Sequence, residues 1–297
     1  MAQDMKTLSD NMRGALLMMA SMAAFTLNDT FFKTVAGELP LFQAILIRGV
    51  MTSVLLAIMA GVRRELFVHI SRSDWKTIGW RTFAEIGATY SFLTALFHMP
   101  IANVTAVLQS LPLAITFAGA MFFGEKVGWR RYGAIAIGFC GMLLIVRPGA
   151  EGFDRYAIYA LVAVAFVVLR DLSTRRLSRT VPSISVALIT AVSITTMGGI
   201  GTISAGWIPV EPVVIARLAG AAVFIIAGYL LSIMVMRVGE IAVVSPFRYT
   251  ALIWAIALGI IVFGEIPDGL TLLGSAIVVG MGIYTFYRER QAEKATR

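Results

Sequence analysis

The sequence contains little charge and almost no cysteine or histidine. Of its 297 residues 14% are charged, one is cysteine and two are histidine, whereas about 25% of residues are charged in an ordinary soluble domain. A single cysteine excludes a disulfide scaffold and a multi-cysteine metal site, and two histidines argue against a histidine-rich metal centre. The low charge also excludes an intrinsically disordered chain, because disordered segments are polar. We expect no metal and no cofactor.

Hydrophobic side chains are abundant instead. They make up 58% of the chain, and the mean hydropathy is +0.83. A soluble protein of this length cannot bury so much apolar surface, so the composition indicates a polytopic membrane protein. The net charge of +8 comes from basic residues in short gaps between apolar runs, which argues against nucleic-acid binding.

Ten apolar runs are long enough to cross a bilayer, or become so when extended into flanking polar residues. The chain is therefore predicted to be an all-α membrane protein with ten transmembrane helices. The longest polar gap, near Val62–Lys76, leaves no room for a soluble catalytic domain. The predicted spans are Gly14–Val35, Leu39–Gly61, Ile78–Phe97, Ile101–Phe123, Tyr132–Ile145, Tyr156–Leu169, Ile184–Ser204, Val213–Met236, Ile241–Phe263 and Leu270–Tyr287.

The basic residues are distributed asymmetrically between the two sides of this topology. With a cytoplasmic N-terminus, 19 of the 25 Lys and Arg residues lie on the inner side, four lie on the outer side, and Arg48 and Arg248 lie within spans. Because cytoplasmic loops carry the excess of basic residues, both termini are predicted to be cytoplasmic.

The chain also resembles itself at a spacing of about 140 residues. Ile101–Thr105 (IANVT) is similar to Ile241–Ser245 (IAVVS), and Phe123–Glu125 (FGE) recurs as Phe263–Glu265. The repeat predicts two five-helix halves, 1–149 and 150–297. Because five is odd, the halves are expected to have opposite orientations in the membrane, an arrangement typical of secondary transporters, in which the cargo site lies between the halves.

These motifs resemble the drug/metabolite transporter (DMT) superfamily, in its ten-helix EamA branch. The motifs that support the resemblance are Phe123–Lys126 (FGEK), Trp129–Arg131 (WRR), Gly138–Gly141 (GFCG), Arg147–Gly149 (RPG), Ser245–Tyr249 (SPFRY) and Phe263–Pro267 (FGEIP). The resemblance implies a central cavity and alternating-access movement of small organic metabolites. Asn28–Asp29, Leu41–Gln43 and Arg48 are most similar to members that handle riboflavin or S-adenosylmethionine.

Arg248 is the strongest candidate for cargo contact. It lies about eight residues into its span, beside Pro246, which removes a backbone donor and weakens the helix. Carbonyl groups freed at this depth must face protein or a watery cavity. Tyr249 and Trp254 are candidates for the same surface, because an aromatic ring can stack on planar cargo. The alternative is a packing kink with a satisfied arginine.

Three further residues are candidates for the cargo site. Arg48 lies about eight residues after Pro40, where it can bind a carboxylate, a phosphate or an electron-rich ring, or form a structural ion pair with Asp29 or Glu85. Gln109 can bond to cargo or to a neighbouring helix. Tyr90 can add a second aromatic wall.

The acidic residues within spans have two open interpretations each. Glu85 either couples transport to protons or pairs with Arg81, four residues before it on the same helix face. Asp29 can likewise act in coupling or pair with Lys33.

Four residues near helix ends are candidates for gates. Asp171 and Arg175 lie four residues apart near the inner end of the sixth span. Glu125 and Glu265 follow helix C-termini, where a carboxylate is unfavourable to the helix dipole. We expect each glutamate to bind nearby backbone donors or basic residues. The small residues of Ala134–Gly141 and Gly274–Gly282 are expected to form helix-packing surfaces, or a dimer interface.

The sequence as a whole favours a secondary active transporter for a small, planar or carboxylate-bearing metabolite in the cell inner membrane, as a monomer or homodimer. A proton-coupled exporter of drugs or amino acids is the alternative. An intramembrane enzyme is disfavoured because no paired catalytic motif is present, a channel because it needs no inverted repeat, and an ATP-driven pump because no nucleotide-binding motif occurs.

Overall fold

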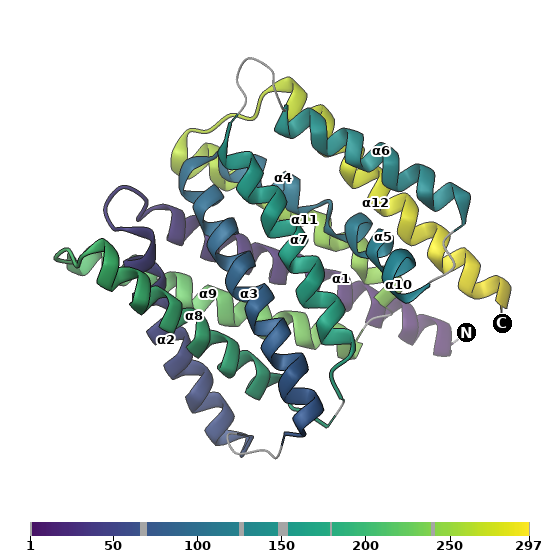
Figure 1. Ribbon diagram of the computed structural model, residues 1–297. Coiled ribbons are helices and arrows are strands. Elements are labelled where there is room, and N and C mark those ends of the chain that lie inside the picture. Colours follow the sequence, from purple (N-terminus) through teal and green to yellow (C-terminus); the bar gives the residue numbers. More distant parts are fainter. Residues whose placement is uncertain are drawn as a thin grey trace. The chain divides into compact units, whose positions relative to one another are not determined.

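A computed structural model describes residues 2–65, 70–124, 128–147, 154–178, 180–238 and 241–296 (Figure 1). Within these residues every regular element is helical. Nine helical segments of this part of the chain are long and apolar enough to cross a membrane. The chain is therefore an all-helical, multi-pass membrane protein.

The first six predicted spans correspond to seven helices. The fourth span is divided between α4 and α5, and the fifth and sixth extend into polar residues as expected. The helices are α1 (Ala2–Lys33), α2 (Leu41–Val62), α3 (Arg72–His98), α4 (Ile101–Leu108), α5 (Leu111–Phe123), α6 (Trp129–Val146) and α7 (Tyr156–Arg175).

The remaining spans include a second divided segment. The ninth predicted span, Ile241–Phe263, changes helix type three times along its length. The elements are α8 (Ser183–Ala205), α9 (Pro212–Val238), α10 (Ile241–Val244), the 3₁₀-helix η1 (Ser245–Tyr249), α11 (Thr250–Leu258), the π-helix η2 (Gly259–Phe263) and α12 (Gly269–Thr296).

The third predicted span, Ile78–Phe97, is helical but differs from the others in polarity. It lies within α3, which is not among the nine apolar candidates. Arg81 and Glu85 within this helix lower its hydropathy. A tenth crossing by α3 stays a prediction, and it depends on these two charges being paired inside the protein.

The helices form two compact units, each built from both halves of the sequence. Unit 1 comprises Met1–Thr30, Met99–Ile158 and Phe224–Arg297, and unit 2 comprises Phe31–His98 and Tyr159–Val223. The units are defined by spatial contact. The division at 149 is defined by sequence similarity, and it stays a prediction.

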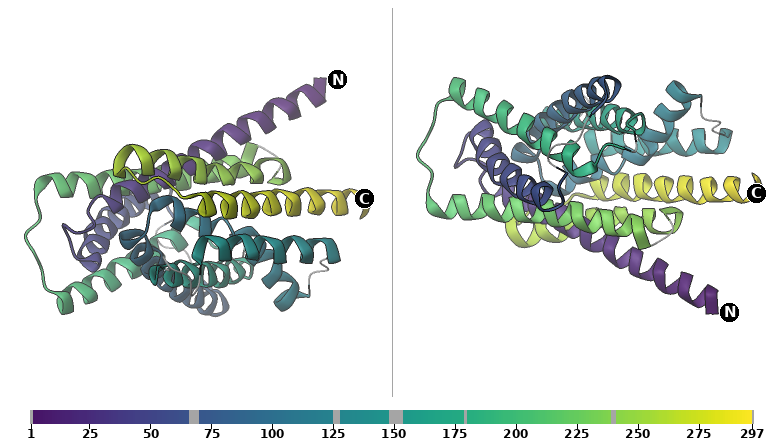
Figure 2. Two further views of the ribbon diagram at one scale, coloured as in Figure 1. Left: turned by 90° about the horizontal axis from the view of Figure 1, so that it is seen from above. Right: turned by 90° about the horizontal axis from the view of Figure 1, so that it is seen from below.

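Close packing of α6 on α12 is the main helix pairing in unit 1 (Figures 1 and 2). A Cβ atom on Gly274 would lie 2.5 Å from the Gly141 carbonyl oxygen, and one on Gly141 would lie 3.0 Å from the Gly274 carbonyl oxygen. The two backbones therefore meet directly, which only glycine permits. The small residues predicted to pack helices do so here, between two helices of one chain.

Unit 2 contains a similar pairing, of α2 with α8. A Cβ atom on Gly198 would lie 2.7 Å from the backbone nitrogen of Leu46, and the hydroxyls of Ser53 and Thr195 lie 3.2 Å apart. α2 and α8 contain the second and seventh predicted spans, and α6 and α12 contain the fifth and tenth. Each close pair thus joins corresponding helices of the two predicted halves.

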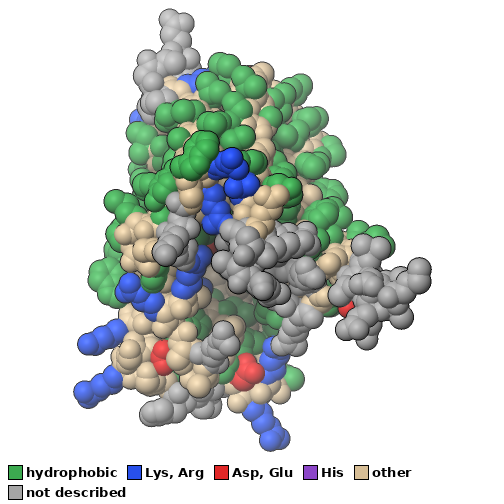
Figure 3. Space-filling view, turned by 90° about the vertical axis from the view of Figure 1, so that its right-hand side faces the viewer, with side chains coloured by type: hydrophobic (Ala, Val, Ile, Leu, Met, Phe, Trp, Pro, Cys, Tyr) green, Lys and Arg blue, Asp and Glu red, His purple; other side chains and the backbone are tan. Residues whose placement is uncertain are grey.

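The surface is rich in exposed apolar side chains. Figure 3 shows hydrophobic side chains over much of one face, with basic side chains among them. Large apolar residues such as Ile203 and Ile261 are more than three-quarters exposed. Exposure on this scale is expected when lipid tails, rather than water, cover the helices.

Two aspartates outside the membrane-spanning segments accept hydrogen bonds at helix ends. Hydrogen bonds from the Ser71 hydroxyl (2.7 Å) and the Ser178 backbone N–H (3.1 Å) lower the pKa of Asp74, at the start of α3. The Thr271 backbone N–H, at 2.8 Å, and the paired Arg147 lower the pKa of Asp268, before α12. Both carboxylates fix helix ends in their charged form.

These two carboxylates predict a loss of stability in acid. Each has a folded-state pKa below its ordinary value of 3.8, so the folded state binds fewer protons than the unfolded state. The stabilisation is complete above that value and disappears as the pH falls through the folded-state pKa. We expect the melting temperature to fall below about pH 4, and to fall less steeply in Asp74→Asn and Asp268→Asn. If the melting temperatures of the two variants and the parent fell equally steeply between pH 5 and pH 3, this assignment would be wrong.

Candidate functional site

A break divides the fourth span between α4 and α5. Gln109 and Ser110 lie at the junction, and Pro112, in the first turn of α5, cannot donate a backbone hydrogen bond. The Ser110 hydroxyl donates to the Val107 carbonyl at 2.7 Å. A side chain thus binds one carbonyl group at the interrupted part of the helix.

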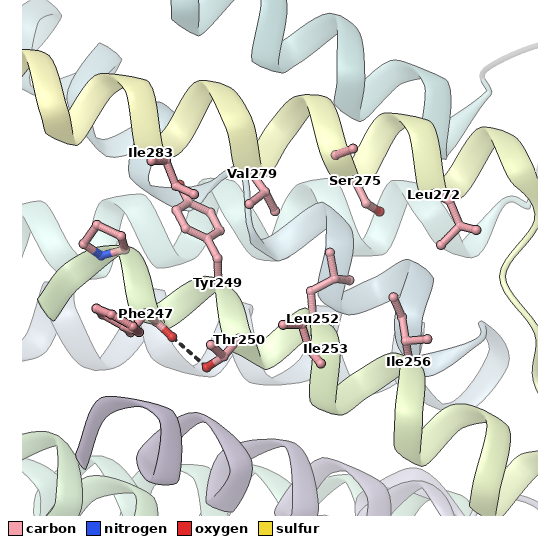
Figure 4. A pocket seen from close by; sticks show the side chains of 12 residues that line it. Phe247, Tyr249, Thr250, Leu252, Ile253, Ile256, Leu272, Ser275, Val279 and Ile283 are labelled. Atoms are coloured by element: carbon pink, nitrogen blue, oxygen red, sulfur yellow. Dashed lines mark hydrogen bonds between the residues drawn. The ribbon is translucent and has the colours of Figure 1, made fainter. Parts of the chain in front are cut away.

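The ninth span is interrupted in the corresponding place. Pro246 lies in the first turn of the 3₁₀-helix η1, which confirms the weakened helix expected at this proline. The Thr250 hydroxyl donates to the Phe247 carbonyl at 2.6 Å (Figure 4). Thr250 and Phe247 follow Ser110 and Val107 by 140 residues each. The same hydroxyl-to-carbonyl bond therefore occurs at the same position of both breaks.

The ends of these two spans also correspond. Gly124 and Gly264 both have a left-handed backbone with φ of 66°, a conformation that favours glycine at a helix C-terminus. The Glu265 carboxylate accepts a hydrogen bond from the Ile101 backbone N–H at 2.9 Å. This contact confirms the backbone donor expected for Glu265, and it places a negative charge at the positive end of α4. Glu125 lies outside the described residues.

Polar atoms without partners lie around the breaks in unit 1. The Gln109 amide nitrogen, the Asn103 amide oxygen and the Tyr249 hydroxyl are buried and have no hydrogen-bond partner among the described residues. A buried unpaired polar group costs about 1–3 kcal/mol, so each calls for a functional explanation. Both predicted roles of Gln109, a bond to cargo and a bond to a neighbouring helix, stay predictions.

A network of charged side chains lies within unit 2. Glu85, on α3, accepts from Arg170 of α7 at 3.1 Å and pairs with Arg81 at 3.6 Å, which confirms the predicted pair with Arg81. Arg170 also donates to Asp171 at 2.8 Å. Two guanidinium groups therefore face two carboxylates, and the cost of placing charges in the membrane is reduced.

Two threonines extend this network to further positions on α7 and α8. Arg81 donates to the hydroxyl of Thr174 at 3.1 Å and to that of Thr190 at 2.6 Å. The network thus connects three helices, α3, α7 and α8. Any movement of one of them against the others must change these bonds.

One aromatic ring, that of Phe32, lies against Arg48 in unit 2. The Arg48 guanidinium lies over the Phe32 ring, 4.3 Å from its centroid, and the side chain is buried. Such a cation–π contact attracts the guanidinium to the face of the ring. The contact stabilises the packing of α2 on α1, and the predicted cargo contact of Arg48 stays a prediction.

Tyr90 belongs to an aromatic stack in the same unit. Its ring is stacked on Phe42 at a centroid distance of 5.7 Å and meets the edge of Tyr159 at 6.3 Å. The stack joins α2, α3 and α7. Tyr90 therefore packs within an aromatic cluster, and its predicted role as a wall of the cargo site stays a prediction.

Comparison with known proteins identifies the first half of the chain. Residues 12–147 match the EamA-like transporter family. This segment is an EamA domain. The match agrees with the drug/metabolite transporter superfamily expected from the sequence motifs.

Relatives of known name match most of the length of the chain. It is 24% identical to the S-adenosylmethionine uptake transporter of Rickettsia conorii, over 92% of each chain. It is 24% identical to a riboflavin transporter of Rhizobium johnstonii, over 74% of this chain and 72% of that one. It is 23% identical to the pseudopaline exporter CntI of Pseudomonas aeruginosa, over 90% and 93%. The relatives are thus transporters, and they include both importers and exporters.

A protein of known crystal structure has the same fold. It is 20% identical, with a TM-score of 0.63, and the match covers 94% of this chain and 98% of that chain. The likeness concerns the helical architecture alone.

The predicted cargo residues fall into two groups. Arg48 and Tyr90 lie in unit 2, and the others lie in unit 1. Arg248 is exposed, whereas Tyr249 is buried and faces α12. Trp254 is 40% exposed on α11. The assignment of these six residues to one cargo surface stays a prediction.

The predicted coupling and gate residues are also distributed between the units. Asp29 lies in unit 1 and accepts from the Asn28 amide at 2.8 Å, whereas Glu85, Asp171 and Arg175 lie in unit 2. The predicted pairs Asp29–Lys33 and Asp171–Arg175 stay predictions.

Sequence reasoning missed several residues that complete these clusters. Phe42 supports Tyr90, Asn103 has an unpaired amide oxygen, and Thr174 and Thr190 bind Arg81. A signal was present for Thr174, because it follows Arg170 by four residues and so lies on the same helix face. The other contacts connect residues far apart in sequence, and no local pattern marks them.

Proposed function

We propose that this EamA protein is a secondary active transporter that moves a small organic metabolite across the cell inner membrane by alternating access. The observation that carries the proposal is the pair of interrupted helices, with corresponding hydroxyl-to-carbonyl bonds 140 residues apart. Discontinuous helices at corresponding places in two halves are typical of transporter binding sites. The family match and the transporter relatives support the same function.

The corresponding helix pairs support an inverted repeat. α2 packs on α8 and α6 packs on α12, as an approximate two-fold relation between the halves requires. Lys and Arg are concentrated on one side of the predicted topology, which supports cytoplasmic termini.

The cargo is proposed to carry a planar ring, a carboxylate or both. Arg48 over Phe32, the stack around Tyr90 and the exposed Arg248 supply cationic and aromatic surfaces. S-adenosylmethionine and riboflavin, named for two relatives, both contain planar ring systems. An amino acid or a nucleoside-like metabolite meets the same chemical requirement.

Proton-coupled export is the second candidate, and one observation favours it. Glu85 is held between Arg81 of its own helix and Arg170 of α7, so a proton on Glu85 would weaken its bonds to both guanidinium groups. Transport driven by a pH gradient and lost in Glu85→Gln would support this candidate. Transport independent of the gradient would exclude it.

A ligand screen tests the transporter assignment. Purified protein is heated with S-adenosylmethionine, riboflavin, amino acids and nucleosides, and each hit is then measured for uptake into proteoliposomes. A ligand present at about 100 Kd stabilises the folded state by about 2.7 kcal/mol, which raises Tm by roughly 5 °C for a chain of this size. We expect at least one compound to raise Tm and to accumulate in vesicles. A panel with neither effect in any compound would contradict the proposed cargo class.

A further inference from the structure

A stripe of basic and aromatic residues runs along one face of α3, in unit 2. With 3.6 residues per turn, its members fall within an arc of about 100° around the helix axis, so they share one face. All of them are exposed, and they are Arg72, Lys76, Gly79, Trp80 and Phe83. The two basic residues come first along the helix and the two aromatic residues come last.

A hollow of about 480 Å³ lies on this stripe, and its volume is within the range of ligand pockets. Its lining includes Lys76, Gly79, Trp80 and Phe83. A Cβ atom on Gly79 would meet no atom within 4 Å, so the missing side chain of this glycine leaves the space open. The Lys76 ammonium group has no ion pair or hydrogen bond among the described residues. The hollow therefore presents an unpaired cation beside two aromatic rings.

The aromatic wall of the hollow is held in place by a third ring. Trp80 and Phe83 meet edge to face with their centroids 6.0 Å apart, and Phe83 meets Phe166 of α7 in the same way at 5.9 Å. A Cβ atom on Gly87 would lie 2.6 Å from the Phe166 ring, so this ring packs directly on the α3 backbone. The wall therefore has its shape before any ligand binds, which lowers the cost of binding.

The charge on this face of α3 favours an anionic occupant. Asp74 and Glu85, the carboxylates of the same part of the helix, are buried and already bonded. The exposed face therefore presents Arg72 and Lys76 without a compensating carboxylate of α3. Lys76 lies just before the predicted span, whereas Phe83 lies within it, about 10.5 Å farther along the helix. The hollow thus leads from a cation at the membrane surface to an aromatic ring in the apolar layer.

We propose that this hollow binds an anionic phospholipid of the cytoplasmic leaflet, with the lipid phosphate at Lys76 and the start of one acyl chain against Phe83. The polar layer of a leaflet is about 5–8 Å deep, so a phosphate at the level of Lys76 places the chain at the level of Phe83. Trp80 lies between these levels, where indole rings are typical. The proposal rests on the predicted crossing of α3 and on the predicted cytoplasmic side of its first residue, and it is independent of the cargo.

Native mass spectrometry of the full-length protein in mild detergent tests this proposal. The protein is incubated with equal amounts of phosphatidylglycerol and phosphatidylcholine. We expect one retained phosphatidylglycerol and a preference of about fivefold, the ratio that corresponds to about 1 kcal/mol for one basic residue near an anionic lipid. Gly79→Trp, which fills the hollow, should remove the bound lipid. Lys76→Gln should remove the preference while one lipid of either kind is retained.

Matched variants separate this site from general effects on lipid binding. Gly280 on α12 is also an exposed glycine on which a Cβ atom would meet nothing within 4 Å, so Gly280→Trp should leave retention unchanged. Arg130→Gln removes an exposed arginine of α6 and should leave the preference unchanged. Equal retention in Gly79→Trp and the parent, equal losses in the two tryptophan variants, or an unchanged preference in Lys76→Gln would overturn the proposal. A change from dimer to monomer in Gly79→Trp, with lipid retention unchanged, would instead assign the hollow to contact between two copies.

Discussion

Replacing Gly274 with leucine is expected to lower the melting temperature of the protein by roughly 6 °C, or about 3 kcal/mol. A Cβ atom at this position would lie 2.5 Å from the Gly141 carbonyl oxygen and 2.7 Å from Ile145. The nearest obstacle is backbone, which cannot rotate away as a side chain can. α6 and α12 must therefore separate, and their buried contact along unit 1 is lost. Thermal unfolding in detergent, followed by circular dichroism, measures the effect.

Gly280 provides a matched control on the same helix. A Cβ atom on Gly280 meets no atom within 4 Å, so Gly280→Leu changes the same residue type without a clash. Replacing glycine with leucine within a helix also stabilises the helix by up to about 1 kcal/mol. This gain is common to both variants. Melting temperatures that fall equally in the two variants would show that the effect does not come from the α6–α12 contact.

Local features of the fold were predictable because they depend on local chemistry. The apolar runs located the helices, and Pro246 located the change to a 3₁₀-helix, because proline lacks the backbone donor that an α-helix requires. Glycines spaced along two spans predicted close helix packing. The sequence did not show that the partners would be α6 and α12, since contacts 130 residues apart leave no periodic pattern.

The candidate site was less predictable, for two physical reasons. The second partner of Glu85 is Arg170, 85 residues away, whereas the pairing with Arg81 follows from the four-residue helix spacing. Arg248 and Tyr249 were assigned to one surface, yet one is exposed and the other is buried. Adjacent residues of a 3₁₀-helix point about 120° apart, so neighbours in sequence seldom share a face.

Arg248→Ala is expected to abolish transport, with uptake reduced at least tenfold, while the protein stays folded and monodisperse. The exposed guanidinium lies in the interrupted helix of unit 1. Backbone carbonyl groups that have lost their helical partners and the cationic side chain can both bind cargo there. Losing one hydrogen bond to a charged group costs about 1.5–3 kcal/mol, which corresponds to a decrease of about 10-fold to more than 100-fold. Uptake into proteoliposomes, normalised to inserted protein, gives the measurement.

Two other arginines show whether this loss is specific to the cargo site. Arg130→Ala removes an exposed guanidinium that lies over Trp129 at the start of α6, and it should leave uptake unchanged. Arg48→Ala removes a buried guanidinium packed on Phe32, so it should lower both Tm and uptake. A variant that loses uptake at unchanged Tm therefore identifies a residue that acts on cargo, and one that loses both has a structural role as well. Full uptake in Arg248→Ala would remove Arg248 from the site and leave the buried arginine of unit 2 as the remaining cationic candidate.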